Sequence, residues 1–278
     1  MGYGADGRVR RRNQRSARPG DGDHGLLQPD AHAHDRGRIP KLVGGLETVA
    51  GEDVAIVADA PRWKTVLFDL DGTLINTIPL IVATFHRTFE HFGVQAPDDE
   101  VMKSWIGLTL EDTFRPVAGE DAADEWVAVY RKFNQEMHDD AVAPFPGVDR
   151  VLADLEAAGC TVGVVTAKLP EMARRGLRVC GLPELSPLVG NGDVERHKPA
   201  PDPVLKALEL VGAEPVGGAG GAVYVGDAPT DIQAGNAAGV DTVGVTWGAA
   251  TREQIDAAHP GQVATSMAEL HKILLPGG

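Results

Sequence analysis

The chain has 278 residues, 43% of them hydrophobic, and a net charge of −14 at pH 7, so it can bury a large core in one domain with an inserted subdomain. No apolar stretch is long enough to cross a membrane, and two cysteines are too few for a disulfide framework. An acidic chain also disfavours nucleic acid as a partner. Together these features predict a cytoplasmic protein that binds neither nucleic acid nor a membrane.

Residues 1–61 differ in composition from the rest of the chain. They begin with an arginine-rich stretch and continue with a segment, residues 19–40, that is dominated by Gly, Pro, Asp and His. No apolar segment follows the arginines, which argues against a secretory signal. Such a composition cannot bury much apolar surface, so we predict a disordered or poorly ordered extension. A nucleic-acid-binding arm is the less favoured alternative.

The first predicted strand, residues 64–69, runs into the segment Asp69-Leu70-Asp71-Gly72-Thr73. Residues two apart on an extended segment point the same way, so Asp69 and Asp71 can face one site. That site would lie at the carboxyl end of a sheet, where open α/β sheets bind ligands. One carboxylate can attack phosphorus covalently while a second acts as its acid/base partner. The alternative is a simple strand-to-turn cap, because Asp-Gly pairs are common in turns.

The following stretch, residues 77–145, is too long for a single crossover helix. A helix can start at Asn76 or Thr77 with Pro79 in its first turn, and apolar residues from Ile78 onward then recur at helical spacing. Further helices are predicted at 98–105, 109–116 and 121–138, and residues 143–147 could serve as a hinge. The stretch is therefore predicted to be an inserted helical subdomain.

Polar residues also follow later apolar runs. Thr166 ends one run, with Lys168 two residues on, and Asp227 ends another, with Asp231 four residues on. Between them, Lys198 begins a proline-rich segment that suits a fixed loop before a helix. Each residue also has a plain structural interpretation: Thr166 could simply end a strand, Lys198 could be a solvated surface lysine, and Asp231 could be a helix N-cap.

From Trp63 onward, strand and helix signals alternate. This alternation predicts an α/β fold, a Rossmann-like doubly wound parallel sheet with helices on both faces. The predicted strands are 64–69, 160–166, 187–190, 222–226 and 242–246. The predicted helices that accompany them are 147–158, 170–180, 201–211, 229–238, 251–258 and 266–274.

Four motifs in order make the chain resemble the haloacid dehalogenase (HAD) superfamily of phosphohydrolases. They are the DLDGT segment at 69–73, the strand-end Thr166, Lys198 of the KPAPDP segment, and GDAPTD at 226–231. The resemblance implies a sheet in which strand 64–69 is central. The domains that it implies are a HAD core at 62–76 and 146–278 and a small helical cap of the C1 type at 77–145, after the extension at 1–61.

The resemblance also implies roles for the site residues. Asp69 would be the nucleophile that forms an aspartyl-phosphate, and Asp71 would be the general acid/base, assisted by Thr166 and Lys198. A phosphoryl group among carboxylates needs a cation to offset the repulsion, and Mg²⁺, which prefers oxygen ligands, is the expected cofactor. The implied metal ligands are Asp69, the backbone carbonyl of Asp71, Asp227 and, through water or by orienting its neighbours, Asp231. The implied substrate-binding residues are Gly72, Thr166, Ala167 and Lys198.

The implied function is a Mg²⁺-dependent phosphatase for small phosphomonoesters, with a small phosphorylated metabolite as its partner, acting as a monomer or homodimer. The resemblance is nearest to the phosphoglycolate phosphatase branch, and residues 68–81 are also similar to the related inorganic pyrophosphatases. Asn76 replaces an Asp that many relatives have, which leaves specificity open. An inorganic pyrophosphatase, a sugar phosphomutase and a non-catalytic phosphate-binding protein are the alternatives, and the intact Asp69 and Asp71 argue against the last.

Substrate choice would depend on the cap, where four basic residues stand out. Each of them could contact a substrate carboxylate or a second phosphate, but a solvated helix face is the favoured interpretation for each one singly. These residues are Lys103, Arg115, Arg131 and Lys132.

Overall fold

The computed structural model describes residues 61–276, so the extension predicted at 1–61 lies outside the described residues apart from Pro61. Within 61–276 the chain forms a parallel six-stranded sheet in the order β5-β4-β1-β6-β7-β8. The predicted α/β fold with a doubly wound parallel sheet is confirmed. The strands are β1 (Thr65–Phe68), β4 (Thr161–Val165), β5 (Leu188–Val189), β6 (Ala222–Gly226), β7 (Asp241–Val245) and β8 (Gln262–Ala264).

Strand β1 is central, as the family resemblance implies. It pairs with β4 on one side and β6 on the other, and Phe68 lies opposite both Val164 and Val225. All four residues of β1 are buried, which suits a strand covered on both faces of a parallel sheet. Because the three strands run in the same direction and in register, the residues that follow them emerge side by side at one edge of the sheet.

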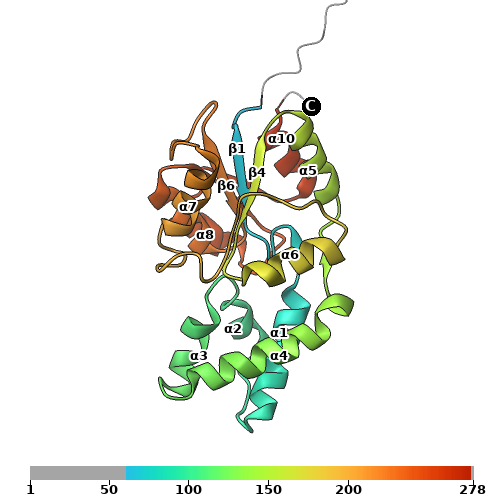
Figure 1. The fold of residues 1–278 in the computed structure, drawn as a ribbon, viewed down its shortest axis with the longest axis vertical. Coiled ribbons are helices and arrows are strands. Elements are labelled where there is room, and N and C mark those ends of the chain that lie inside the picture. The colour runs from blue at the N-terminus through green and yellow to red at the C-terminus, as the bar shows by residue number, and fades with distance from the viewer. Residues whose placement is uncertain (1–60, 277–278) are drawn as a thin grey trace, which may run out of the picture. The chain divides into compact units, whose positions relative to one another are not determined.

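Alternate residues of β1 point to opposite faces of the sheet, and different helices cover each face (Figure 1). Val66 and Phe68 pack in one hydrophobic cluster with α5, α6 and α10. Leu67 packs on the other face with α7 and α8. The helices of this part are α5 (Val148–Ala157), α6 (Pro170–Val179), α7 (Asp202–Val211), α8 (Pro229–Ala238), α9 (Arg252–Ala257) and α10 (Met267–Leu274), each within two residues of its predicted bounds.

The stretch between β1 and β4 is helical, as predicted, and has an apolar cluster of its own. Its helices are α1 (Ile78–His91), α2 (Asp99–Lys103), α3 (Leu110–Ala118) and α4 (Ala123–Ala141). Helices α1 and α4 pack together around Phe85, whose ring lies against those of Phe114 and Tyr130. That these helices form a separate cap domain with the limits 77–145 stays a prediction.

Three short strands were not predicted. Strand β8 has only three residues and carries no run of β-branched or aromatic residues to mark it. Strands β2 (Ile75–Asn76) and β3 (Ala143–Pro144) form an antiparallel pair at the two ends of the helical stretch. The segment interpreted as a hinge is therefore partly a strand, and Asn76 lies in β2 while Thr77 is the N-cap of α1.

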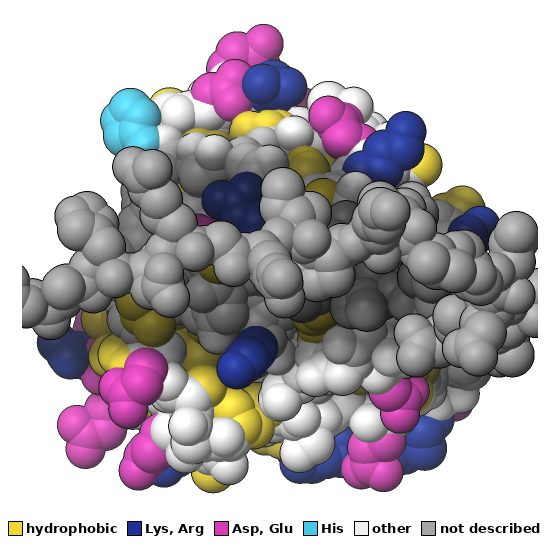
Figure 2. All heavy atoms as spheres, turned by 90° about the horizontal axis from the view of Figure 1, so that it is seen from above, with side chains coloured by type: hydrophobic (Ala, Val, Ile, Leu, Met, Phe, Trp, Pro, Cys, Tyr) yellow, Lys and Arg dark blue, Asp and Glu magenta, His cyan; other side chains and the backbone are white. Residues whose placement is uncertain are grey.

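None of the helices in residues 61–276 is both long and apolar enough to cross a membrane. On the face seen in Figure 2, acidic and basic side chains of the described residues are interspersed rather than gathered by sign.

Candidate active site

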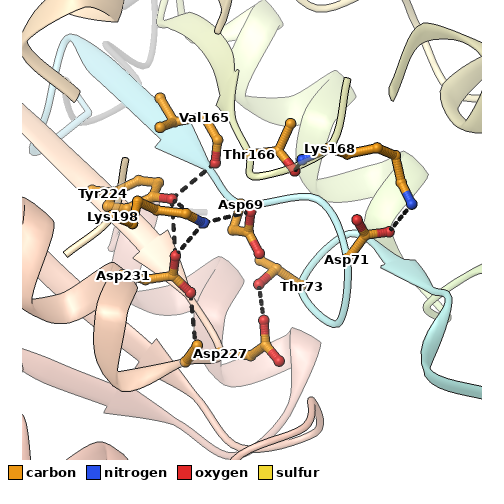
Figure 3. Close-up of polar contacts among 11 residues, drawn as sticks. Asp69, Asp71, Thr73, Val165, Thr166, Lys168, Lys198, Tyr224, Asp227 and Asp231 are labelled. Carbon is orange, nitrogen blue, oxygen red and sulfur yellow. Dashed lines mark hydrogen bonds and ion pairs between the residues drawn. The ribbon is translucent and has the colours of Figure 1, made fainter. Parts of the chain in front are cut away.

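Three strand ends bring polar residues together at one edge of the sheet (Figure 3). Asp69 follows β1, Thr166 follows β4 and Asp227 follows β6, and each is at most 4% exposed. The backbone N–H of Asp69 still donates to the carbonyl of Val225 at 2.8 Å, so the sheet ladder fixes its position. Because β1 lies between β4 and β6, the three residues lie close together at one edge of the sheet, as predicted.

Lys198 lies in the loop before α7, and its ammonium group is buried among three acceptors. Nζ donates to Oδ1 of Asp69 at 2.9 Å, to Oδ1 of Asp231 at 2.6 Å and to the hydroxyl of Tyr224 at 3.2 Å. An ammonium group has three donors, so all of them are used. The interpretation of Lys198 as a solvated surface lysine is thus wrong, since the residue is 6% exposed.

Both carboxylate oxygens of Asp227 accept hydrogen bonds. Oδ1 accepts from Oγ1 of Thr73 at 3.0 Å, and Oδ2 accepts from the backbone N–H of Ala249 at 2.8 Å. Gly72 has a φ of +85°, and a Cβ built there would overlap this carboxylate. A glycine is therefore required both by the backbone conformation and by the close approach of Asp227.

Asp231 lies in the first turn of α8 and is completely buried. Its Oδ2 accepts from the backbone N–H of Ala228 at 3.0 Å. Ala228 is the N-cap residue of this helix, so the interpretation of Asp231 as the N-cap is wrong: it caps the helix from its third position. Its Oδ1 accepts from both the ammonium group of Lys198 and the hydroxyl of Tyr224, which favours an indirect role toward a metal ion.

Three carboxylates are buried here against one ammonium group. Burial raises the pKa of Asp69 well above its ordinary value, against the opposing charge of Lys198. Burial and the charge of Asp231 raise the pKa of Asp227 to about 7. The pKa of Lys198 is also raised: burial opposes its charge, but the charges of Asp231 and Asp69 outweigh that effect. The cluster therefore lacks positive charge.

A divalent cation fits this cluster. Carboxylate oxygens of Asp69, Asp227 and Asp231 all lie within 4.8 Å of one another, and oxygen donors of this kind suit Mg²⁺ and Ca²⁺. A bound cation would supply the missing positive charge and keep the carboxylates ionised. The residues thus fit a divalent metal ion.

Asp71 faces a different cation. Its Oδ1 lies 3.1 Å from Nζ of Lys168, and both side chains are mostly buried. The contact is an ion pair without hydrogen-bond geometry, because the same oxygen has no hydrogen-bond partner in residues 61–276. The backbone N–H of Lys168 donates to Oγ1 of Thr166 at 3.2 Å. Lys168 is thus a mostly buried residue of this site and not an exposed surface lysine.

A cavity of about 100 Å³ lies between this edge of the sheet and the inserted helices. From the sheet side it is lined by Asp69, Asp71, Thr166, Ala167 and Lys168, whereas Gly72 and Lys198 are not part of its lining. Oδ2 of Asp69 accepts no hydrogen bond from residues 61–276, so it is available to a ligand. The opposite side is mostly apolar and includes Ile81, Phe85, Trp105, Ile106, Leu108 and Leu110.

Two contacts join the inserted helices to the sheet side of the cavity. Nδ2 of Asn191, in the loop after β5, donates to Oε2 of Glu111 on α3 at 3.3 Å. Gly107 has a φ of +95°, and a Cβ there would lie 3.1 Å from Cβ of Ala228 and 3.2 Å from Oγ1 of Thr230. The absence of a side chain at Gly107 thus allows this loop to approach the start of α8.

Three residues of the site were missed by sequence reasoning. Tyr224 donates from its hydroxyl to the carbonyl of Val165 at 2.9 Å as well as contacting Lys198. Thr73 holds Asp227, and Nε1 of Trp247 donates to the backbone carbonyl of Thr73 at 3.2 Å. Only Tyr224 carried a signal, since a phenol inside a predicted buried strand needs a hydrogen-bond partner.

Comparisons with known proteins agree with this geometry. A profile of the haloacid dehalogenase-like hydrolase family matches residues 66–245, which is more than half of the chain. The chain belongs to this family. The match begins in β1 and ends in β7, so it contains every predicted site residue.

Named relatives lie in the same family. The chain is 37% identical to Pyrophosphatase PpaX of Bacillus mycoides over 214 residues, which are 77% of this chain and 97% of that protein. A putative haloacid dehalogenase-like hydrolase from Bacteroides fragilis superposes with a TM-score of 0.70 and 28% identity, covering 75% of this chain and 100% of that chain. A predicted phosphoglycolate phosphatase from Haemophilus somnus superposes with a TM-score of 0.66 and 26% identity, covering 76% of this chain and 97% of that chain. The predicted family and the prediction of a hydrolase enzyme with phosphatase relatives are confirmed.

Proposed function

We propose that this chain is a Mg²⁺-dependent phosphatase that hydrolyses small phosphomonoesters through an aspartyl-phosphate on Asp69. The observation that supports this most is the cavity at the sheet edge, whose lining contains both Asp69 and Asp71. The adjoining acidic cluster fits a divalent cation. A site that only bound phosphate would need neither a nucleophile nor an acid/base partner.

The first step transfers the phosphoryl group to the protein. Oδ2 of Asp69 attacks phosphorus, and the bond between phosphorus and the ester oxygen breaks. Asp71 gives its proton to that oxygen, so an alcohol leaves. Lys168 then stabilises the carboxylate that remains on Asp71, since its Nζ lies 3.1 Å from Oδ1 of Asp71.

The second step returns Asp69 to its starting state. Asp71 takes a proton from a water molecule, which attacks phosphorus from the side opposite Asp69. The bond between phosphorus and Asp69 breaks, and inorganic phosphate leaves with the oxygen of that water. Asp71 is thereby protonated again, so the same residue serves as acid and base in turn.

The remaining residues hold charge and position. Asp69, Asp227 and the backbone carbonyl of Asp71 would hold Mg²⁺, which neutralises and orients phosphoryl oxygens when bound. Asp231 would act indirectly, because its Oδ1 already accepts from the ammonium group of Lys198 and the hydroxyl of Tyr224, whereas within residues 61–276 each oxygen of Asp227 accepts from only one neutral donor. Lys198 would hold Asp69 through Oδ1, leaving Oδ2 for attack, and the hydroxyl of Thr166 would donate to a phosphoryl oxygen.

A pyrophosphatase is the second candidate function, favoured by the name of the Bacillus mycoides relative and its 97% coverage. The chemistry at Asp69 would be the same, with phosphate in place of an alcohol as the leaving group. The two functions therefore differ in what the inserted helices accept and share the residues of the sheet edge.

The test is phosphate release from 2-phosphoglycolate, pyrophosphate and hexose phosphates, with Mg²⁺ and with EDTA. We expect release that needs Mg²⁺ and one preferred substrate, which decides between the two functions. Asp71→Asn should slow both formation and hydrolysis of the intermediate, while Asp124→Asn, an exposed carboxylate on α4, should change neither. No release from any substrate by a folded protein would contradict the proposal.

A further inference from the structure

The four basic residues of the inserted helices have different surroundings. Lys103 donates to Glu100 at 2.7 Å, and Arg115 pairs with Glu120 at 2.9 Å; both pairs lie on the surface. Lys132 is exposed. Of the four, Arg131 alone lines the cavity that also contains Asp69 and Asp71. The solvated-face interpretation therefore suits three of them and fails for Arg131.

The guanidinium of Arg131 is held in place from one side. Its Nη2 donates to Oε1 of Glu111 at 2.8 Å, and the other oxygen of Glu111 accepts from Asn191 at 3.3 Å. Glu111 thus connects Arg131 on α4 to the loop after β5 and restricts the rotamers that Arg131 can adopt. A guanidinium fixed in this way loses little entropy when it binds a second partner.

The donor next to Nη2 is not satisfied. Nε of Arg131 is buried and has no hydrogen-bond partner in residues 61–276. A buried N–H donor without an acceptor is costly, and native proteins seldom leave one unpaired. Arginine presents its donors in a planar fork that matches a carboxylate or a phosphate. Within residues 61–276 only Nη2 of Arg131 has a partner, so its remaining N–H donors suit an anionic group.

Charge within the cavity favours the same conclusion. The other cation of the lining, Lys168, is already paired with Asp71 at 3.1 Å. The inserted helices contribute mainly apolar side chains to the cavity, among them Ile81 and Phe85. The neutral amides of Asn134 and Gln135 also line it, but Arg131 is the one cation of the lining without a carboxylate of the sheet edge as its partner within residues 61–276, so an anionic group on the far side of a substrate would bind there.

We propose that Arg131 is a specificity-determining residue that binds a second anionic group, a carboxylate or a phosphate, on the leaving-group side of the substrate. This inference rests on the proposed phosphatase activity. It assigns reaction at phosphorus to Asp69 and recognition of the second anion to Arg131. Substrates with that second charge are thereby preferred to neutral esters of the same size.

The test compares Arg131→Met with the matched control Lys132→Met on two substrates of similar size. These are 2-phosphoglycolate, which has a carboxylate, and ethyl phosphate, which does not. We expect Arg131→Met to lower kcat/KM for 2-phosphoglycolate by about ten- to a hundredfold, mainly through KM, and to change ethyl phosphate by less than about twofold. Lys132→Met should leave both unchanged.

A double variant removes the main confounding effect. In Arg131→Met the unpaired Glu111 could repel an anion, so Glu111→Gln/Arg131→Met tests whether the loss persists without that charge. Gln keeps an oxygen for Asn191, and thermal melting checks that each variant is folded. A persistent, selective loss supports the proposal. Recovery in the double variant, equal losses on both substrates, or no loss on either would overturn it.

The wild-type reaction separates this inference from the one on which it rests. Release of phosphate from ethyl phosphate together with any of those three results contradicts the role of Arg131 alone. A folded wild-type protein that releases phosphate from neither of these substrates nor from the hexose phosphates and pyrophosphate contradicts the proposed function, and the role of Arg131 fails with it.

Discussion

The two sides of the cavity differ in the interactions that form them: buried charged groups on the sheet side and mainly apolar packing on the side of the inserted helices. The sheet side buries Asp69, Asp227 and Asp231 around Lys198, and hydrogen bonds fix the carboxylates of Asp227 and Asp231 on both oxygens. The side formed by the inserted helices is an aromatic and aliphatic cluster, and within residues 61–276 no carboxylate lies in its part of the cavity lining. The difference teaches that reaction chemistry and substrate choice are carried by separate elements, so variants of the two sides should fail in different ways.

The largest expected effect is the loss of the nucleophile on the sheet side. Asp69→Asn should lower kcat by on the order of 10³ or more, because an amide cannot form the acyl phosphate. The side chain keeps its size and an oxygen for Lys198, so circular dichroism and thermal melting should show a folded protein. Substantial remaining turnover, measured by phosphate release, would remove Asp69 from this role.

Removing the cation of the sheet side should cost stability. Lys198→Met leaves Asp69 and Asp231 facing each other without an ammonium group, which should lower the free energy of unfolding by about 3–5 kcal/mol at pH 8. The loss should shrink at pH 5, since Asp69, whose pKa is raised by burial, can then take up a proton. Urea unfolding at both pH values measures this, with Lys103→Met as the surface control. Equal losses from both variants would contradict the contrast between the two sides.

Metal binding should depend on pH through Asp227. In the cation-free protein the pKa of Asp227 is raised to about 7, so below that pH a cation must displace a proton. The affinity for Mg²⁺ should therefore weaken by roughly tenfold per pH unit below pH 7 and level off above it. Titration calorimetry at pH 6 in two buffers of different ionisation enthalpy should show proton release. An affinity that does not change between pH 6 and pH 8 would contradict this.

The same pKa shift has a consequence for folding. Because the pKa of Asp227 in the folded protein exceeds the ordinary value of 3.8 for an aspartate, the cation-free protein should lose stability as pH rises from 3.8 toward 7. Saturating Mg²⁺ should reverse this trend. Denaturant unfolding with EDTA and with Mg²⁺ across this pH range measures both.

A smaller effect is expected from the hydroxyl of Tyr224. Tyr224→Phe removes the hydrogen bonds to Lys198 and to the carbonyl of Val165 while keeping the ring in its packed position. The free energy of unfolding should fall by about 1–2 kcal/mol, and kcat should change by only a few-fold. Chemical denaturation and initial rates measure the two. A loss of activity as large as that of Asp69→Asn would give Tyr224 a catalytic role that this account denies it.

The smallest effect should come from a surface cation of the inserted helices. Arg115→Gln breaks exposed pairs with Asp112 and Glu120, so its effect on the free energy of unfolding should stay within about 0.5 kcal/mol. Its kinetics with 2-phosphoglycolate should match the wild type. A selective rise in KM for that substrate would mean that anion recognition extends beyond Arg131.

The sheet side could be predicted from the sequence because Asp69 and Asp227 each follow an apolar run. Strand ends are local features, and in-register parallel strands bring Asp69, Thr166 and Asp227 to one edge. What the local pattern does not contain is long-range pairing. Lys198 and Asp69 are 129 residues apart, and their contact follows only from the complete fold. For the same reason Tyr224, which looks like one more strand residue, was not recognised.

The other side could be predicted as helices but not as a lining. Arg131 and Lys132 are adjacent and similar in charge, yet one lines the cavity and the other is exposed. Which of them faces inward depends on how α4 packs against α1, where Tyr130 lies against Phe85. Helical periodicity alone does not specify that rotation closely enough.

The central claim is that Asp69 carries the phosphoryl group during turnover. The most direct measurement is rapid acid quenching of the protein with ³²P-labelled substrate and Mg²⁺, followed by mapping of the labelled peptide. We expect the label on the peptide that contains Asp69, in an acid-stable and base-labile linkage, and none in Asp69→Asn. Turnover without covalent label, or label on a different peptide, would contradict the account.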